Sequence, residues 1–419
     1  MSALLIENVR LIDPASRLDV HGGLLVRDGR IEAVGEAVDA PHDVERMDGG
    51  GAVLAPALID LRARAAEPGA GPERLHETLR RAAAGGIGTL VLAADSGSGI
   101  ATPEQVEWVG ARAVSSPVRL LASGLAVRDG AMAEIGLMLK AGAVYLSDGG
   151  IPQADSSLVR RLMAYSAGFE AWFSLRAEDA FLARDTTATE GDLSARLALA
   201  ARPALSEALA IERNAGLAAL SGGRLLVDRV TTREGLAAIA NARLRGVEIA
   251  ATAPITHLMF NEVDAGGFDT RYRLEPPLRA QSDREALIEA LSEGRIDAIV
   301  SDHTPVQGFE KANPFSDAPP GSAHLEAVLP ALCSLVAENR LSLLEALAPV
   351  TSGPAGLLGL NQGRLTPGAP ADLVLFDPDA PIVMPRVAND PPSAFSGRRL
   401  FGRILMTMVD GAIIVEPQP

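Results

Sequence analysis

The chain has few cysteines, histidines and aromatic residues. Its 419 residues include one cysteine, six histidines, and only 4% phenylalanine, tryptophan and tyrosine. One cysteine cannot form an internal disulfide, which excludes a disulfide-stapled fold. Cys333 stands in the apolar run LPALCSLV with no histidine close to it in sequence. We therefore expect a small buried helix residue rather than a nucleophile.

Excess positive charge and long apolar runs are also lacking. Acidic residues outnumber basic ones by 53 to 38, which gives a formal net charge of −15 and argues against binding to nucleic acid or to anionic membranes. No apolar run approaches the roughly 18 residues that span a bilayer. The first residues, MSALLIENVRLIDP, lack the basic-then-apolar pattern of a signal peptide. We expect a cytoplasmic protein.

Hydrophobic residues make up 47% of the chain, and both of its ends are rich in predicted strands. Asp28-Gly29 and Asp410-Gly411 each separate two short apolar runs, which is typical of a β-hairpin turn. The two ends therefore predict one small β-sandwich domain formed from residues 1–53 and 362–419.

Between residues 54 and 361 short apolar strands alternate with longer helical stretches, which indicates βα units and a parallel sheet. Eight candidate strands match the count of a (β/α)8 barrel, so the fold class predicted is α/β, a TIM-like barrel with the small sandwich beside it. The candidate strands are residues 54–59, 89–93, 118–122, 143–146, 171–175, 224–227, 247–251 and 298–300.

The first candidate strand runs into the stretch APALIDLRARAAEPG, residues 55–69. In a barrel the loops that follow the strands carry the active site. This stretch resembles the motif Asp-x-His-x-His-Leu-Arg-Glu-Pro-Gly of the dihydroorotase family, within the amidohydrolase superfamily. The later segments YRLEPPLR, GRIDAIVSDHTP and GRLTPGAPADLVLFDP are also dihydroorotase-like in order and spacing.

All four positions that hold metal-binding histidines in that family carry arginine in this chain. These positions are Arg62, Arg64, Arg176 and Arg229. A guanidinium stays protonated and has no lone pair to offer a metal. The resemblance implies zinc, but with these ligands replaced we expect no metal and no other cofactor.

Two acidic residues match family site positions, and four family substrate positions have changed. Asp148 in YLSDGG and Asp302 in IVSDHTP remain. The resemblance places the substrate groups at Ala66, Asp95, Glu275 and Val306, where the family has arginine, asparagine, asparagine and histidine. We therefore expect neither a catalytic nor a substrate-binding site.

Three interpretations of the arginine cluster stay open. In the first, the arginines pair with Asp148, Asp302 and nearby acids and close the barrel mouth. The resemblance then implies a non-catalytic dihydroorotase-like partner of aspartate carbamoyltransferase, in a homo- or hetero-oligomer. In the second, the cluster binds an anion such as a pyrimidine intermediate. In the third, the chain is a cyclic amidohydrolase with a reduced metal site; its candidate residues are Asp148, His257, Asp302 and His303.

Overall fold

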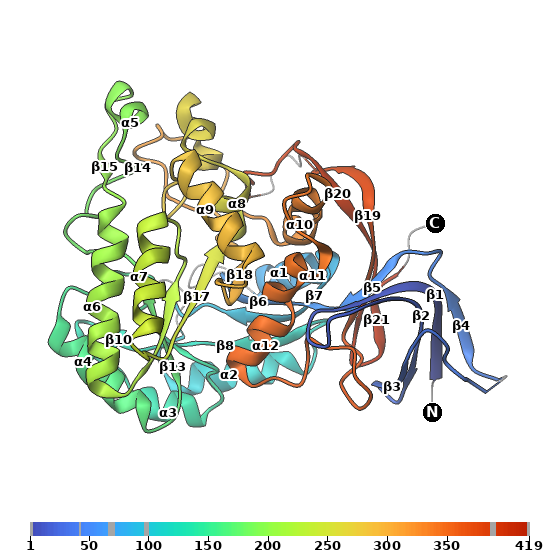
Figure 1. Cartoon of the computed structure of the whole chain (residues 1–419). Helices are drawn as coiled ribbons and strands as arrows, with labels where there is room; N and C mark the ends of the chain where they lie inside the picture. Colours follow the sequence, from blue (N-terminus) through green and yellow to red (C-terminus); the bar gives the residue numbers. More distant parts are fainter. Residues whose placement is uncertain (1–2, 42, 66–71, 96–99, 386–390, 417–419) are drawn as a thin grey trace.

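A parallel barrel occupies the middle of the chain in the computed structural model, and a sheet of terminal strands lies beside it (Figure 1). The structure describes residues 3–41, 43–65, 72–95, 100–385 and 391–416. Within them the barrel strands are β6 (Leu58–Ala63), β7 (Ile87–Leu92), β8 (Arg119–Ala122) with its continuation β9 (Gly124–Leu125), β12 (Leu146–Ser147), β13 (Trp172–Arg176), β16 (Arg224–Asp228), β17 (Ile249–Pro254) and β18 (Ala298–Val300).

Parallel pairing runs round the barrel in sequence order. A parallel bridge between Ala63 and His303 brings the two ends of the barrel together, and the Arg64 N–H donates to the His303 carbonyl at 2.8 Å. The predicted α/β barrel is confirmed.

Helices surround the barrel. They are α1 (Pro72–Ala84), α2 (Pro103–Ala113), α3 (Ile135–Lys140), α4 (Ser156–Ala167), α5 (Asp192–Arg196), α6 (Leu205–Ser221), α7 (Arg233–Leu244), α8 (Ile255–Met259), α9 (Gln281–Ser292), α10 (Val328–Ala337), α11 (Leu343–Leu347) and α12 (Ser352–Leu358). Short 3-10 turns lie at η1 (Glu262–Gly267), η2 (Thr270–Tyr272), η3 (Leu325–Ala327) and η4 (Ala348–Val350). Gly86 and Gly294 follow α1 and α9 with φ of 74° and 66°, as helix-ending glycines do.

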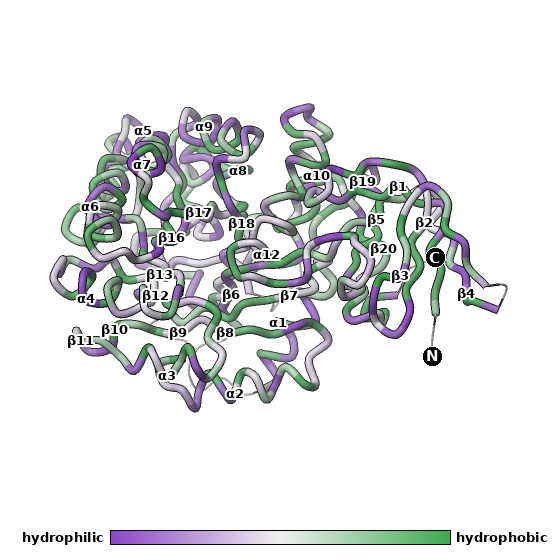
Figure 2. Tube along the Cα trace, turned by 60° about the horizontal axis from the view of Figure 1, so that its bottom comes forward, coloured by the Kyte–Doolittle hydropathy of each residue, from purple (hydrophilic) through white to green (hydrophobic). Residues whose placement is uncertain are grey.

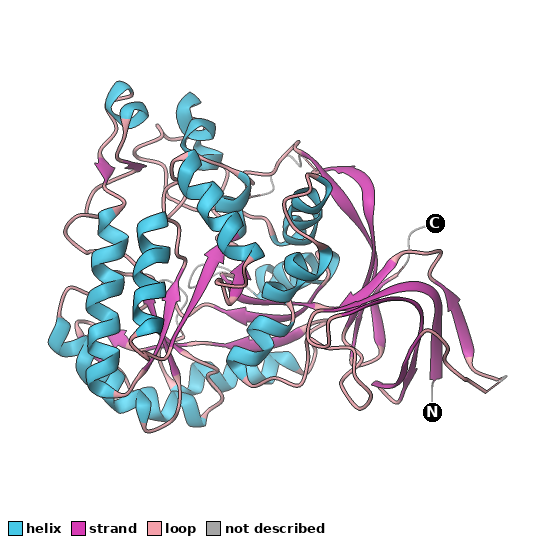
Figure 3. Ribbon diagram, viewed as in Figure 1, coloured by secondary structure: helices cyan, strands magenta, loops and turns pink. Residues whose placement is uncertain are grey.

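Strands from both ends of the chain form one eight-stranded sheet (Figure 3). Its strands are β1 (Ala3–Asp13), β2 (Leu18–Arg27), β3 (Arg30–Gly35), β4 (Glu45–Asp48), β5 (Val53–Pro56), β19 (Leu373–Val383), β20 (Arg399–Val409) and β21 (Ala412–Val415). The order is β21-β20-β19-β5-β1-β2-β3, with β4 beside β1. Both predicted hairpin turns are present, and Asp28, Gly29, Asp410 and Gly411 all have positive φ.

The prediction of a single strand over residues 54–59 is wrong. The chain forms β5 in the terminal sheet, where it pairs with β1 and β19, and then β6 in the barrel, where it pairs with β7. Ala57 separates them and donates its N–H to the Asp372 carbonyl at 2.9 Å. Because both strands are fully buried, the apolar run continues across the change of sheet and hydrophobicity cannot mark it.

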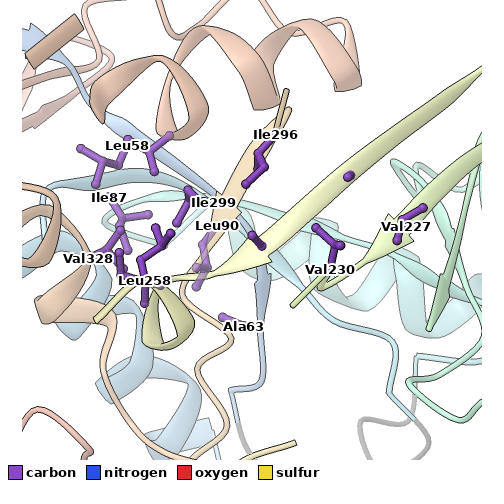
Figure 4. Close-up of a cluster of buried hydrophobic side chains, with 14 of the residues drawn as sticks. Leu58, Ala63, Ile87, Leu90, Val227, Val230, Leu258, Ile296, Ile299 and Val328 are labelled. Carbon is purple, nitrogen blue, oxygen red and sulfur yellow. The ribbon is translucent and has the colours of Figure 1, made fainter. Parts of the chain in front are cut away.

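The hydrophobic core fills the space between the barrel strands and the surrounding helices (Figure 4). Leu58, Ile87 and Leu90 from the first strands pack with Ile299 and with Val328 of α10. Cys333 lies in the same cluster, on α10 and 2% exposed, as predicted. None of the described helices combines the length and apolar character that a bilayer-spanning segment needs.

Two short strand pairs of the described chain lie outside the barrel strands. They are β10 (Val127–Arg128) with β11 (Ala131–Met132), and β14 (Ala188–Thr189) with β15 (Ala201–Arg202). Figure 1 draws β14 and β15 beyond the upper end of α6. The β14–β15 excursion brings a segment about 25 residues downstream of Arg176 back over the mouth of the barrel. It thereby contributes side chains that no barrel strand could supply.

Candidate functional site

The predicted site residues gather at the carboxyl ends of the barrel strands. Arg62 lies near the end of β6, Arg176 ends β13, and Arg229 directly follows β16. Asp95 follows β7 and Asp302 follows β18. Because these strands are parallel, their carboxyl ends share one face, which in this fold carries the active site. Ala66 lies outside the described residues, as do the neighbouring Glu67, Pro68 and Gly69.

Arg62 is the centre of a first cluster of buried ion pairs. Its Nη1 and Nη2 donate to the two carboxylate oxygens of Asp95 at 2.8 and 3.0 Å, and its Nε donates to Asp302 Oδ1 at 3.0 Å. The Arg62 side chain is 9% exposed. Burial lowers the pKa of Arg62, but the surrounding carboxylates outweigh burial and raise it overall. Burial likewise opposes the ionised form of Asp95, yet Arg62 holds the pKa of Asp95 below its usual value.

Arg229 pairs with Asp302, as Arg62 does, and completes the first cluster. Its Nη1 donates to Asp302 Oδ1 and Oδ2 at 3.0 and 3.2 Å and to the Glu275 carbonyl at 2.7 Å. Its Nη2 lies 3.0 Å from Asp228 Oδ2. Arg229 and Asp302 both have positive φ, of 61° and 53°, a conformation that costs free energy for residues other than glycine. The ion pairs hold both residues in that conformation.

A second cluster lies beside the first and is built from four arginines and three glutamates. Arg176 donates to Glu178 through Nε at 3.0 Å and also pairs with Glu275. Arg202 pairs with Glu178 and donates to Glu275 Oε1 and Oε2 at 2.7 and 3.1 Å. Arg279 Nη2 lies 3.1 Å from Glu178 Oε1. Despite its burial, Glu178 has a lowered pKa because three arginines surround it.

Across the two clusters seven arginines face six carboxylates. The first contains Arg62, Arg64 and Arg229 with Asp95, Asp228 and Asp302. The second contains Arg176, Arg202, Arg273 and Arg279 with Glu178, Glu207 and Glu275. We call these thirteen residues the arginine–carboxylate network. Each buried charge in it has a partner, as burial of charge requires.

Asp148 does not join the network as an ion-pair partner, contrary to the prediction. Its Oδ2 accepts from the backbone N–H of Arg176 at 2.7 Å and its Oδ1 from Gly150 at 2.9 Å, so the guanidinium of Arg176 points elsewhere. Burial raises the pKa of Asp148 to about 7. A carboxyl that accepts two backbone N–H groups at the end of β12 fixes the loop that follows this strand.

Asp60 joins the first and last barrel strands. Its Oδ1 accepts from the backbone N–H groups of Arg62 and Ser301, each at 3.1 Å, and its Oδ2 accepts from the Ser301 hydroxyl. Burial raises the pKa of Asp60 to about 6 although these hydrogen bonds lower it. Asp60 therefore links β6 to the segment that follows β18, next to Arg62 of the network.

The histidines near the barrel mouth are held by the backbone. His257 Nε2 lies 3.1 Å from the Pro277 carbonyl, and His303 Nδ1 accepts from the backbone N–H of His324 at 3.0 Å. Burial lowers the pKa of His257 to about 3 and that of His324 to about 4, and it also lowers the pKa of His303. Among the described residues, no three His, Cys, Asp or Glu side chains are placed to share a metal ion. The side chains present do not fit the zinc centre that the family resemblance implies.

Several members of the network were not singled out from the sequence, among them Arg273 and Arg279 of the segment YRLEPPLR. Asp228 directly precedes Arg229 at the end of a strand, which is a signal that could have identified it. Arg202 comes from the β14–β15 excursion and Glu207 from α6, and no pattern in sequence links either to the site. Two of the positions that the resemblance assigned to substrate have different surroundings. Glu275 is part of the network, whereas Val306 is buried in the loop after β18.

Comparisons with known proteins identify the class. A model of the amidohydrolase family matches residues 32–415, so the chain belongs to the amidohydrolase family. It is 34% identical to a dihydroorotase-like protein of Pseudomonas aeruginosa, over 98% of this chain and 99% of the relative. It is 33% identical to a dihydroorotase of Syntrophotalea carbinolica, over 98% of each chain.

Solved structures agree on the fold. An L-hydantoinase (dihydropyrimidinase) from Arthrobacter aurescens superimposes with a TM-score of 0.87 at 23% identity, over 100% of this chain and 97% of the other. A D-hydantoinase superimposes with a TM-score of 0.86 at 21% identity, over 99% and 95%. At these identities the structural match establishes the barrel and the sheet of terminal strands, but not the activity.

Proposed function

We propose that this chain is a dihydroorotase-like protein of pyrimidine biosynthesis that does not interconvert N-carbamoyl-L-aspartate and dihydroorotate. In this proposal it serves as a structural and assembly partner of aspartate carbamoyltransferase. The observation that carries the proposal is the arginine–carboxylate network, which fills the face where an amidohydrolase would bind metal and substrate.

The chemistry of the side chains supports the loss of activity. Amide hydrolysis in this family needs a group that polarises the carbonyl and a base that activates water. A guanidinium cannot ligate a metal and does not give up its proton near neutral pH. Of the two retained site carboxylates, Asp302 is paired with both Arg62 and Arg229, and Asp148 accepts two backbone N–H groups. Both carboxylates are therefore engaged by other groups of the described chain rather than free to activate a water molecule.

Aspartate carbamoyltransferase as the partner is supported by the family resemblance and by the fold that the chain retains. The relatives include proteins named dihydroorotase and dihydroorotase-like over nearly the full length. The barrel and the sheet of terminal strands are intact although the site has changed. A fold kept without its chemistry is consistent with a role for the outer surface in binding another protein.

Ring closure of N-carbamoyl-L-aspartate tests the loss of activity. The assay follows dihydroorotate formation with and without added zinc, with the Syntrophotalea carbinolica dihydroorotase as the active control. We expect no rate above buffer and no stoichiometric zinc. Zinc uptake together with a rate that disappears in Asp302→Ala would contradict the proposal and support a cyclic amidohydrolase that uses Asp148, His257, Asp302 and His303.

Anion binding is the second candidate function, and the position of Arg64 favours it. The Arg64 side chain is 25% exposed, more than any other arginine of the network, and its Nε lies 3.7 Å from Asp95. Calorimetric titration with N-carbamoyl-L-aspartate, orotate and phosphate distinguishes the two functions. A heat of binding that is lost in Arg64→Met would assign an anion site. No heat of binding with any of the three anions would support the structural role.

A further inference from the structure

Arg273 is the arginine of the network whose charge has the weakest compensation. Its side chain is 9% exposed. Its Nη1 donates to the carbonyl of Leu274 at 3.2 Å, and its buried Nε has no hydrogen-bond partner in the described chain. A guanidinium carries five N–H donors, and a buried donor without an acceptor costs free energy. The described residues therefore leave the donors of Arg273 largely unused.

Glu275 compensates the charge of Arg273 only in part. It lies 3.8 Å from Arg273 Nη1, which is too far for a hydrogen bond. The same carboxylate also pairs with Arg176 and accepts from Arg202 at 2.7 and 3.1 Å. Burial lowers the pKa of Arg273, and the charges of Arg202 and Arg176 lower it further, while Glu275 opposes them. With seven arginines against six carboxylates in the network, the excess positive charge falls at Arg273.

Lys311 places a second buried cation beside Arg273. It is 5% exposed, and its Nζ donates to the carbonyls of Thr270 and Arg273 at 2.8 and 3.0 Å. The described chain gives Lys311 no ion pair, because the nearby Asp269 pairs with Arg271. Burial, followed by the charge of Arg273, lowers the pKa of Lys311 to about 7, although Asp269 opposes this. Two cations thus share a buried region with little negative charge left to balance them.

Both cations lie on the face that carries the network. Arg273 lies between α8 and α9, after β17, and Lys311 lies in the loop after β18. Because β17 and β18 are neighbouring parallel strands, the segments that follow them leave the barrel at one face. Figure 2 shows α8 and α9 side by side. Thr270 Oγ1 donates to the Lys311 carbonyl at 2.6 Å and the Gly321 N–H donates to the Arg273 carbonyl at 3.0 Å, so both backbones are fixed.

The chemistry of the two cations suits a small oxyanion. A guanidinium binds the paired oxygens of a phosphate or carboxylate with two parallel N–H donors, and an ammonium adds a compact charge. Only a small part of either side chain reaches the surface, which favours a single phosphate or carboxylate group over a nucleotide. Each of the two nearby carboxylates, Glu275 and Asp269, already pairs with another arginine.

We propose that Arg273 and Lys311 form a binding site for a small oxyanion at the edge of the barrel mouth, with a phosphate or carboxylate group as the ligand. The site belongs to the second cluster, whereas Arg64, the arginine that favours the second candidate function, pairs with Asp95 in the first. The site requires neither the loss of hydrolytic activity nor the partner protein, so its test is independent of the proposed function.

Calorimetric titration of the full-length protein with inorganic phosphate, and separately with succinate, tests the site against a chloride blank of equal ionic strength. We expect binding of at least one oxyanion, weakened at least about tenfold in Arg273→Met because charge-assisted hydrogen bonds are lost. Arg273→Lys keeps the charge and should weaken it less. Arg340→Met is the matched control, because Arg340 forms a partly exposed ion pair with Glu285. Binding of phosphate alone or of succinate alone would identify the group that the site takes.

Urea unfolding without added oxyanion distinguishes a binding role from a structural one. Arg273 lacks acceptors in the described chain, so Arg273→Met should leave the unfolding midpoint in chloride buffer unchanged or higher. Millimolar phosphate should raise the midpoint of the native protein, as a ligand that binds the folded state does, but not that of the variant. A midpoint that falls in Arg273→Met as far as it falls in Arg62→Met would make Arg273 a structural ion-pair partner and overturn the proposal.

Side-chain NMR can follow Lys311 directly, because the chain has two lysines and the other, Lys140, is exposed. An anion beside the ammonium stabilises its charged form, so in protein labelled with ¹³C at lysine Cε the oxyanion should raise the pKa of Lys311 above about 7. Arg273→Met should abolish this shift, and the Lys140 signal is the internal control. No binding above the chloride blank, binding lost in Arg64→Met but kept in Arg273→Met, or a Lys311 pKa that the oxyanion leaves unchanged would overturn the proposal.

Discussion

Replacing Arg62 with methionine removes the centre of the first ion-pair cluster while keeping an apolar side chain of similar reach. Arg62 makes two hydrogen bonds to Asp95 and one to Asp302, and its side chain is 9% exposed. The substitution leaves three carboxylates in a buried site, of which Asp228 and Asp302 keep Arg229 and Asp95 keeps the more distant Arg64.

The expected cost is about 3 to 5 kcal/mol of unfolding free energy at pH 7, which is typical when one partner of a buried ion pair is removed. An exposed pair of the same geometry gives the comparison. Arg10 donates to both oxygens of Asp19 at 2.8 Å, and each side chain is 38% exposed. Arg10→Met should therefore cost no more than about 1 kcal/mol.

The cost of Arg62→Met should also depend on pH. In the native protein the pKa of Asp95 lies below its usual value, so Asp95 contributes stability above its unfolded pKa and loses it as the pH falls. Without Arg62 the buried Asp95 carboxyl prefers to be protonated. The difference between the variant and the native protein should then be largest near pH 7 and become smaller toward pH 4.

Urea unfolding followed by circular dichroism, at several pH values, measures both effects. A loss at pH 7 no larger than that of Arg10→Met would refute the idea that the network is a buried structural element. A difference that stays constant with pH would refute the electrostatic explanation.

Three further substitutions test other parts of the account by the same unfolding assay. Burial raises the pKa of Asp148 to about 7, so native stability should fall as the pH rises from about 4 to 7, and Asp148→Asn should flatten that slope. Glu207 accepts the backbone N–H and the hydroxyl of Thr231 at 2.9 and 2.6 Å, and Glu207→Ala should cost about 3 to 5 kcal/mol by leaving buried donors and charge unpaired. Gly402 has a φ of 104°, and a Cβ there would lie 2.8 Å from Cys333 Sγ, so Gly402→Ala should cost about 1 to 3 kcal/mol.

Local sequence patterns predicted most of the fold. The two Asp-Gly turns could be identified because positive φ at both positions suits these residues. Strands such as β16 and β18 appeared as short apolar runs between helices. The change from β5 to β6 could not be seen, because two buried strands in succession look like one and the break depends on which sheet each strand joins.

The candidate site was predictable only where its residues follow barrel strands. Arg62, Arg176 and Arg229 were identified by their positions in family motifs, and their pairing with Asp302 or nearby acids follows from the cost of burying charge. Arg202 was not identifiable, because it reaches the network through the β14–β15 excursion, whose short strands have no clear alternation. Asp148 was placed in the right loop but was expected to pair with arginine side chains. It instead accepts from backbone N–H groups, and residue types do not indicate which backbone groups a side chain will meet.

The measurement that tests the central claim most directly is light scattering on this chain co-expressed with the aspartate carbamoyltransferase of the same organism, compared with each protein alone. The account predicts a discrete heavier complex that contains both chains. It also predicts that the complex persists in Arg64→Met, whose side chain lies at the barrel mouth. Two independent peaks at all concentrations would contradict a role in assembly.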